Sequence, residues 1–390
     1  MALAVTLALL AGNGAAGRSA RAGNPTGASE QQQVLDVLVS GPHRIAPGVT
    51  AYVSGPHGTW TGAAGMANVG TGAPMAAETR LRLASVSKLW TAVVVLRLVQ
   101  QGKLSLDNTV EQRLPGVLPY GRRITVRQLL NHTSGMIDSN DIVHFPQRYI
   151  SQIKDPALRA KVTAISRKLA ENPGYEVSPR VWVEIAAALP LLLDPGSVYH
   201  YSNIGYDVAG LVAERAGKAG LATLIRREIT APLGLSSAAY DPHSRITGPH
   251  AHGYSVARNG KLTDTTTWTM GIGAGGSMVS DAADEAGFLT GLMRGKLLRP
   301  ALLTALKTPS NVSRNGLGLG IGYALGTGVS PSGCAGIAFG HNGGLDGFEA
   351  NVFVSGTGKR VAVLLLNGRT ADDSGDETAF QAMNRLYCAA

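Results

Sequence analysis

The sequence has little charge for its length: Asp, Glu, Lys and Arg make up 16% of 390 residues. This composition excludes a highly charged disordered chain or coiled coil, and 44% hydrophobic residues are enough for a buried core. The net charge is +9, but no cluster of Lys and Arg with interleaved aromatic residues is present. We therefore expect no nucleic-acid partner, and interpret the charge as a solvated basic surface.

A hydrophobic run of the roughly 20 residues that a membrane-spanning helix needs is also missing. The apolar stretch from Ala2 to Gly12 is shorter and is typical of a secretory signal peptide. Ala20-Arg21-Ala22 then offers a cleavage site, although no positive residue precedes Ala2. Residues 1–22 are therefore predicted to be a signal peptide. We expect a secreted protein with no stable membrane span and, since no Cys follows the apolar stretch, no lipid anchor.

Cysteine is nearly absent, and the only two are Cys334 and Cys388. In an exported protein such a pair can form a disulfide. Closing a loop of this length would stabilise the fold by roughly 4 kcal/mol in the chain-entropy treatment. Two buried free thiols are the alternative that the residues alone leave open.

Strand patterns occur near both ends of the chain. They are predicted at residues 49–53 and 59–66, and again at 336–339, 348–354 and 361–366. Asn342-Gly343 is a strong hairpin signal, so a turn is expected there, and a second turn is expected at residues 356–358.

Helical patterns occur near both ends of the chain and throughout its middle. Ser29 and Gln32 form a capping-box pattern before an apolar helical face that ends at Gly41. The helix that follows Ser85 and ends at Gly102 is apolar all round, so it is expected to be buried. A last helix covers residues 377–387. Shorter helices, separated by Pro and Gly, are predicted at residues 125–130, 157–169, 181–193 and 204–216.

This order of elements predicts an α+β fold, in which an antiparallel sheet is flanked by helices and carries an inserted all-α region. We expect one domain over residues 29–390. Its mixed part covers residues 29–104 and 261–390, and its all-α insert covers residues 105–260.

Ser85-Val86-Ser87-Lys88 is an S-x-x-K motif. Residues three apart share a face of a helix, so the Lys88 amine can lie beside the Ser85 hydroxyl. A hydroxyl needs a base to become a nucleophile, and burial lowers the pKa of a lysine enough for that task. The motif alone is weak, because Ser151-Gln152-Ile153-Lys154 matches equally well. Only Ser85 leads into a long buried helix, which favours it over Ser151.

Tyr201-Ser202-Asn203 is the second motif. Ser202 or Asn203 is also a good N-cap for the helix that follows, and by itself the cap is the simpler interpretation. In the functional interpretation, Tyr201 is a proton shuttle for Ser85 and Lys88, and Asn203 donates a hydrogen bond to the substrate.

His341-Asn342-Gly343-Gly344 is the third motif. The simpler interpretation is a hairpin turn. In the functional interpretation this segment is a sheet edge beside Ser85, since glycines let a substrate backbone approach closely. The Gly344 and Ser85 N–H groups would then hold an oxyanion.

In this order the three motifs resemble those of the penicillin-recognising serine hydrolases, which include class C β-lactamases, related esterases and extracellular D-alanyl-D-alanine carboxypeptidases. The resemblance extends from about Ser29 to the C-terminus. Other stretches that look like this family are residues 83–85, 101–107, 124–130, 132–135, 195–196, 201–206 and 340–343.

The resemblance implies a β-lactamase/transpeptidase-like fold and an acyl-enzyme mechanism with Ser85, Lys88 and Tyr201 as catalytic residues. Trp268 matches an aromatic wall of that active site. The D,D-carboxypeptidases also have cysteines where Cys334 and Cys388 stand, which implies a disulfide. The residues implied to bind substrate are Asn203, His341, Asn342, Gly343, Gly344 and Trp268.

The expected activity is therefore a D-alanyl-D-alanine carboxypeptidase that acts on peptidoglycan peptides or β-lactams, as a monomer. The sequence departs from the D,D-carboxypeptidases in two ways that concern the substrate. Those enzymes have an Arg before the third motif to receive a terminal carboxylate, whereas residues 316–323 here contain no basic residue. They also have hydroxyl side chains around that motif, where Asn342 and Gly344 stand here. Arg314 or His341 is the available substitute. An esterase, a β-lactamase and a catalytically inactive penicillin-binding sensor domain are the alternatives.

Other patterns carry no function. The G-x-G-x-x-G string at residues 271–276 lacks the preceding buried strand and the following acidic residue of a dinucleotide site. His250 and His252 lack a further ligand for zinc. His132 and His200 are assigned no role. We expect no cofactor and no metal.

Overall fold

The computed structural model describes residues 25–41, 44–243, 245–268, 273–310, 312, 322–332, 334 and 336–390. The predicted signal peptide, residues 1–22, lies outside this part of the chain. Within it, no helix is long and apolar enough to cross a membrane.

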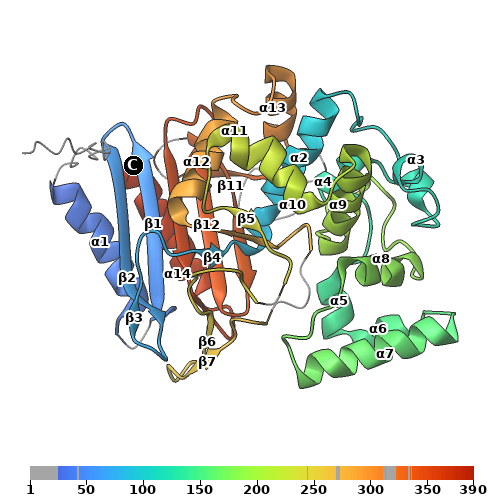
Figure 1. The fold of residues 1–390 in the computed structure, drawn as a ribbon, viewed down its shortest axis with the longest axis horizontal. Coiled ribbons are helices and arrows are strands. Elements are labelled where there is room, and N and C mark those ends of the chain that lie inside the picture. The colour runs from blue at the N-terminus through green and yellow to red at the C-terminus, as the bar shows by residue number, and fades with distance from the viewer. Residues whose placement is uncertain are drawn as a thin grey trace, which may run out of the picture.

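An antiparallel sheet with strand order β3-β2-β1-β13-β12-β11-β10-β9 forms the centre of the fold (Figure 1). It joins the first strands of the chain to the last, because β1 pairs with β13 from Val49↔Leu366 to Ser54↔Val361. The strands are β1 (Gly48–Gly55), β2 (Gly58–Asn68), β3 (Ala73–Pro74), β9 (Gly322–Tyr323), β10 (Gly328–Ser332), β11 (Gly336–Leu345), β12 (Phe348–Ser355) and β13 (Val361–Leu366).

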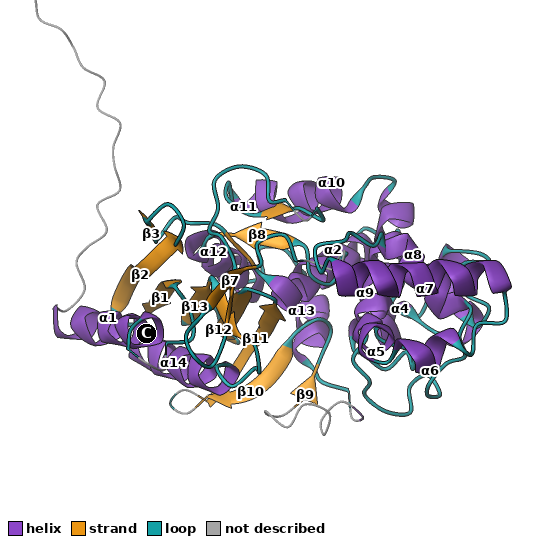
Figure 2. Cartoon of the chain, turned by 90° about the horizontal axis from the view of Figure 1, so that it is seen from below, coloured by secondary structure: helices purple, strands orange, loops and turns teal. Residues whose placement is uncertain are grey.

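Helices cover both faces of this sheet (Figure 2). On one face α1 (Pro25–Val39) and α14 (Asp376–Ala389) pack on Leu364 and Leu366 of β13. On the other face α12 (Ala282–Met293) packs with Val363 and Leu365. Since both faces are covered, β13 is apolar along its whole length rather than alternating. The predicted α+β class and flanking helices are confirmed.

Helices fill the region beyond the sheet, at the right of Figure 1. The insert predicted to be all-α up to residue 260 is helical only to Leu233, since strands β5 (Ala239–Tyr240) and β6 (Tyr254–Val256) follow. These strands are too short to give a period of two in the sequence. The helices are α3 (Val110–Arg113), η2 (Gly121–Arg123), α4 (Val126–Leu130), α5 (Ser139–His144), α6 (Pro146–Ile150), α7 (Pro156–Glu171), α8 (Pro179–Ala187), α9 (Asn203–Gly217), α10 (Leu221–Ile225), η3 (Arg226–Thr230) and α11 (Ala231–Leu233).

Two small sheets connect the parts, with strand orders β14-β6-β7 and β4-β8-β5. The strand β4 leads directly into the turn η1 and the buried helix α2. The remaining elements are β4 (Leu81–Arg82), η1 (Ala84–Val86), α2 (Ser87–Gln100), β7 (Leu262–Asp264), β8 (Met278–Ser280), α13 (Pro300–Lys307) and β14 (Gly368–Thr370).

Two local predictions are wrong. The turn expected at Asn342-Gly343 is absent, because β11 continues through both residues in register with β12, and the chain reverses after Leu345. Pairing along the whole of β12 overrides the local turn preference. The helix expected to start at the Ser29 capping box begins at Pro25 instead, so Ser29 lies inside α1.

The disulfide is confirmed. Cys334, which lies between β10 and β11, is bonded to Cys388 near the end of α14, with the two Cα atoms 5.6 Å apart. The bond therefore fastens the last helix to the hairpin that leads into the His341 segment.

Candidate active site

Ser85 lies on a strained turn between β4 and α2. Ala84, immediately before it, has φ +47°, which a side chain with a Cβ rarely adopts. The turn lies against β11: a Cβ added to Gly343 would be 2.4 Å from the Leu83 carbonyl oxygen and 2.8 Å from the Ser85 nitrogen. Glycine at 343 is therefore required for this close approach.

Lys88 is completely buried one helical turn after Ser85. Its Nζ donates to Ser85 Oγ at 3.1 Å, to Asn203 Oδ1 at 2.7 Å and to the Gly275 carbonyl at 2.9 Å. Burial lowers the pKa of Lys88 to about 7. The amine can therefore be neutral near physiological pH, as a base for Ser85 must be.

Tyr201 completes the contacts of the Ser85 hydroxyl. Its phenol donates to Ser85 Oγ at 2.7 Å, and Lys88 Nζ lies 4.7 Å from the centre of its ring. Burial raises the pKa of Tyr201 well above its usual value, so the phenol carries its proton at neutral pH. Ser85 Oγ thus lies between an amine and a phenol.

Ser202 explains how the residues on either side are held. Its Oγ caps α9 by accepting from the Gly205 N–H at 3.0 Å, and donates to the Ile137 carbonyl at 2.8 Å. The cap interpretation is therefore correct for Ser202. It does not compete with the other interpretation, because the side chains of Tyr201 and Asn203 both reach the Ser85–Lys88 pair.

Asp138 is a functional residue that sequence reasoning missed. Its carboxylate accepts from the Asn203 backbone N–H at 2.7 Å and from Asn203 Nδ2 at 3.2 Å. This fixes the amide so that its oxygen faces Lys88 and one of its N–H groups is already used. Asp138 is also the N-cap of α5, and Asp is a preferred residue at that position, which is the signal in the sequence that could have drawn attention to it.

His132 was also missed. Its Nδ1 accepts from the Ser202 N–H at 3.1 Å, and its ring stacks on Tyr201 with centroids 4.3 Å apart. The ring centres of Tyr206 and Tyr323 lie 5.1 and 4.8 Å from it. His132 therefore packs against the Tyr201 ring and helps to fix its position. His200, by contrast, makes none of these contacts.

The β11 segment lies beside Ser85 as a local edge of the sheet. Pairing with β10 ends at Gly328↔Gly340, so residues 341–345 pair on one side, with β12. His341 Nε2 lies 3.1 Å from the Tyr323 hydroxyl, and burial lowers the pKa of His341 to about 3. The imidazole is therefore neutral and offers no positive charge.

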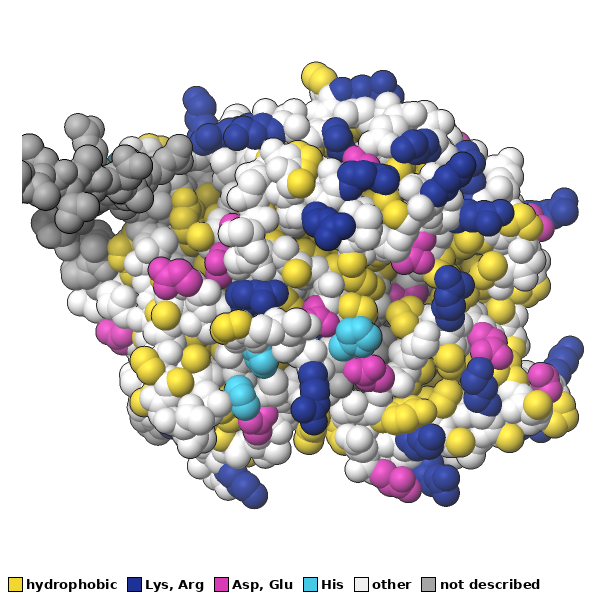
Figure 3. Space-filling model, viewed as in Figure 1, with side chains coloured by type: hydrophobic (Ala, Val, Ile, Leu, Met, Phe, Trp, Pro, Cys, Tyr) yellow, Lys and Arg dark blue, Asp and Glu magenta, His cyan; other side chains and the backbone are white. Residues whose placement is uncertain are grey.

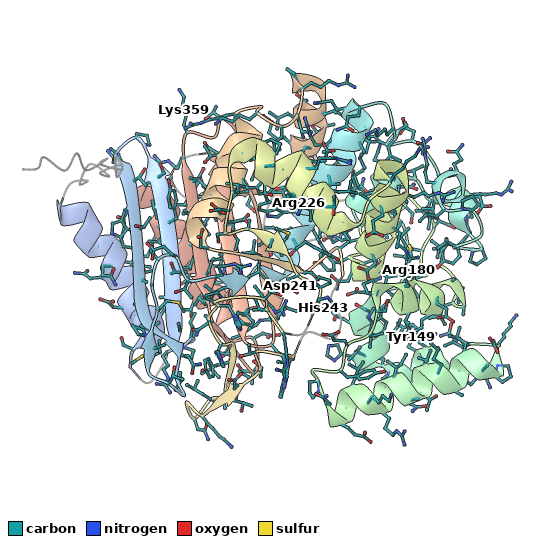
Figure 4. The ribbon with its side chains drawn as sticks, in the orientation of Figure 1. Tyr149, Arg180, Arg226, Asp241, His243 and Lys359 are labelled. Atoms are coloured by element: carbon teal, nitrogen blue, oxygen red, sulfur yellow. A yellow bond between two sulfur atoms is a disulfide. The ribbon has the colours of Figure 1, made fainter. Side chains whose placement is uncertain are left out.

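Two cavities border Ser85, and both are also lined by Tyr201 and Gly344. The larger, of about 700 Å³, also contains Asn203 and Trp268 and extends to α5–α8. Figure 4 labels Arg180 of α8 in the helical region, and Asp241 and His243 in the segment after β5; none of these three residues lines either cavity. The smaller cavity, of about 250 Å³, is lined by Ser85, Tyr199, Tyr201, Tyr323, Gly328, His341, Asn342 and Gly344.

The two cavities differ in charge. The described residues around the smaller one include no Lys or Arg. Asp207, Asp346 and Asp373 line the larger one, where Arg369 pairs with Asp376 at 2.9 Å and with Asp373 at 3.2 Å. The basic residues of the outer surface are spread among acidic ones on the face in Figure 3 and form no single patch there.

The β-lactamase family profile matches residues 36–384. The chain belongs to the β-lactamase family. This confirms the family expected from the three motifs.

Across the described residues, no group of three or more His, Cys, Asp or Glu side chains is arranged to hold a metal ion.

Several known proteins are similar to the chain. A D-stereospecific amidohydrolase from Streptomyces sp. has 28% identity and a TM-score of 0.73, over 91% of this chain and 98% of that one. Penicillin-binding protein 4* from Bacillus subtilis is 22% identical over 80% of this chain and 66% of its own length. Esterase EstB from Burkholderia gladioli is 32% identical over 46% of this chain. The match spans less than half the length of several curated relatives, 43% in EstB.

Proposed function

We propose that this protein hydrolyses an amide or ester bond through an acyl-enzyme formed on Ser85. The observation that carries the proposal is the position of Ser85 Oγ, 3.1 Å from Lys88 Nζ and 2.7 Å from the Tyr201 hydroxyl. A hydroxyl held between an amine of lowered pKa and a protonated phenol has both a proton acceptor and a proton donor.

In this mechanism the Ser85 oxygen attacks the substrate carbonyl while the neutral Lys88 amine takes its proton. The N–H groups of Ser85 and Gly344 stabilise the negative oxygen that develops. Tyr201 gives its proton to the leaving group and recovers one from Lys88. Water then attacks the ester, and the same groups transfer protons in the opposite direction to free Ser85.

Other residues bind rather than react. Asn203 holds Lys88 and has one N–H left for the acyl group, and Trp268 lines the cavity that this group would occupy. Gly343 keeps β11 close to the Ser85 turn, while His341 and Asn342 border the smaller cavity.

Replacement of Gly343 by alanine is expected to lower kcat/KM by about 100-fold, because the added Cβ would push β11 away from Ser85 and misalign the oxyanion donors. Hydrolysis of p-nitrophenyl acetate measures the effect. Gly220→Ala is the matched control, since its Cβ would meet nothing nearer than 3.9 Å. Equal activity of the two variants would contradict the role given to Gly343.

We assign the larger cavity to the acyl group and the smaller to the leaving group. The leaving-group side has no described Lys or Arg, and its imidazole is neutral, so a terminal carboxylate would be poorly stabilised there. Arg369 also lines the larger cavity and pairs with Asp373, so Asp346 is the carboxylate that would receive an ammonium group on the acyl side. A D-aminoacyl amide or ester combines these features, and the similarity to the Streptomyces amidohydrolase supports it.

The D-alanyl-D-alanine carboxypeptidase expected from the sequence is the second candidate. The similarity to penicillin-binding protein 4* and the disulfide, which suits an exported protein, favour it. A secreted protein that acts on peptidoglycan peptides would follow from this candidate.

A pair of acyl-D-Ala-D-Ala peptides, one with a free carboxylate and one amidated, separates the two candidates. We expect the amidated peptide to be cleaved with at least about tenfold higher kcat/KM, because the described residues around the smaller cavity include no cationic partner for a free carboxylate; Arg314 lies outside the described residues. Release of D-alanine or D-alaninamide is measured by chromatography. Faster cleavage of the free acid would establish the carboxypeptidase instead.

A further inference from the structure

The larger cavity changes character with distance from Ser85. Near Ser85 its lining includes polar side chains: Asn203, which binds Lys88, and Asp346, which directly follows β11. Toward the helical region the lining is mixed, because Ser139, Asn140, His144 and Ser166 lie there beside a set of apolar residues that we call the apolar wall. The apolar wall consists of Val143, Leu169, Ala170, Pro173, Trp182 and Trp268.

The apolar wall is held by elements that pack into the main core. Leu169 is 7% exposed and Trp182 is 3% exposed, so both are fixed by neighbours on their other sides. The helix α7 carries buried residues at 158, 162, 165 and 169, which is the spacing of one helical face. The cavity is therefore bounded by rigid side chains rather than by a loop alone.

The size of this cavity exceeds the needs of a small acyl group. About 700 Å³ lies within the range of sites that enclose whole drug-sized ligands, whereas an alanyl group would leave most of it filled by water. An apolar wall that remains wet contributes nothing to binding, but burying an aromatic or branched aliphatic side chain against it would be favourable.

We propose that the apolar wall selects substrates whose acyl group carries a bulky apolar side chain. This inference rests on the proposed acyl-enzyme function of Ser85. The carbonyl would lie at Ser85, any ammonium near Asp346, and the side chain against Leu169, Ala170 and Trp182. Small acyl groups such as alanyl would react at the same serine but gain none of this contact.

Ala170 offers a direct test, because it is exposed at the end of α7 and borders the cavity. The substrates are p-nitrophenyl acetate and p-nitrophenyl 3-phenylpropanoate, and each rate is corrected for hydrolysis by the Ser85→Ala variant. We expect the wild-type kcat/KM to be at least about tenfold higher for the phenylpropanoate. In Ala170→Phe the added ring would occupy the cavity, and this ratio should fall by about tenfold.

Ala160→Phe is the matched control, since Ala160 is exposed on the same helix and does not border the cavity. Its ratio should equal that of the wild type. A wild-type ratio near one, or equal ratios in the two Phe variants, would overturn the inference while leaving the acyl-enzyme intact. If neither ester acylates Ser85, the proposed function fails, and this inference fails with it.

Discussion

Replacing Ser85 by alanine is expected to lower kcat/KM by at least about 10⁴-fold, because the reaction then has no nucleophile to form the acyl-enzyme. Ser85 Oγ accepts from both Lys88 and Tyr201, and no other hydroxyl has that pair of partners among the hydrogen bonds of the described residues. The loss should therefore appear with ester and amide substrates alike. Hydrolysis of p-nitrophenyl acetate, followed by absorbance, gives the rate.

Ser151→Ala is the control for this experiment, since residues 151–154 carry the second S-x-x-K match. Ser151 is exposed, and its hydroxyl donates to the Arg148 carbonyl at 3.2 Å rather than to a lysine. Its activity should match that of the wild type. Comparable activity in Ser85→Ala and Ser151→Ala would refute the assignment of the nucleophile.

Replacing Lys88 by methionine is expected to lower kcat/KM by about 10³-fold or more, because the base for Ser85 is lost while the apolar stem is kept. The pH profile identifies the cause. Since burial lowers the pKa of Lys88 to about 7, the amine becomes protonated as the pH falls through that value. The wild-type rate should then decrease by about tenfold per pH unit below the pKa, whereas above it the rate should level off.

The rate of the Lys88→Met variant should not show this decrease below about pH 7, which we call the acidic limb of the pH profile. Lys154→Met, at the end of the second S-x-x-K match, provides the control and should keep both the rate and the pH dependence of the wild type. A Lys88→Met protein that retains the limb near pH 7 would show that another group accepts the proton.

The sequence was sufficient to predict the family and the residues that meet at Ser85. Three short motifs in a fixed order outweighed the local alternatives, each of which was reasonable by itself. Ser202 illustrates this: it caps α9, as the simpler interpretation held, and the same cap directs Tyr201 and Asn203 toward Lys88.

The failures arose where long-range contacts decide the structure. Asn342-Gly343 favours a turn locally, but pairing from Ala338↔Ser355 to Leu345↔Phe348 keeps it in a strand. Gly343 is needed for the approach of β11 to the Ser85 turn, and no pattern in the sequence reveals that neighbour.

Asp138 and His132 were missed for a related reason. Their partners, Asn203 and Tyr201, lie far away in the chain, so no local spacing connects them. His132 belongs to residues 132–135, which resemble the family, and Asp138 follows them. The resemblance alone does not say which side chains they contact, so it gave them no role. Burial, which lowers the pKa of Lys88, likewise depends on the whole fold rather than on the motif.

The most direct test of the account is the intact mass of the protein after rapid mixing with benzylpenicillin or an activated ester, followed by peptide mapping. The account predicts a covalent acyl adduct on Ser85 that forms at the wild-type rate in Ser151→Ala and is absent in Ser85→Ala. An adduct on another residue, or hydrolysis of the ester by Ser85→Ala at the wild-type rate, would contradict it.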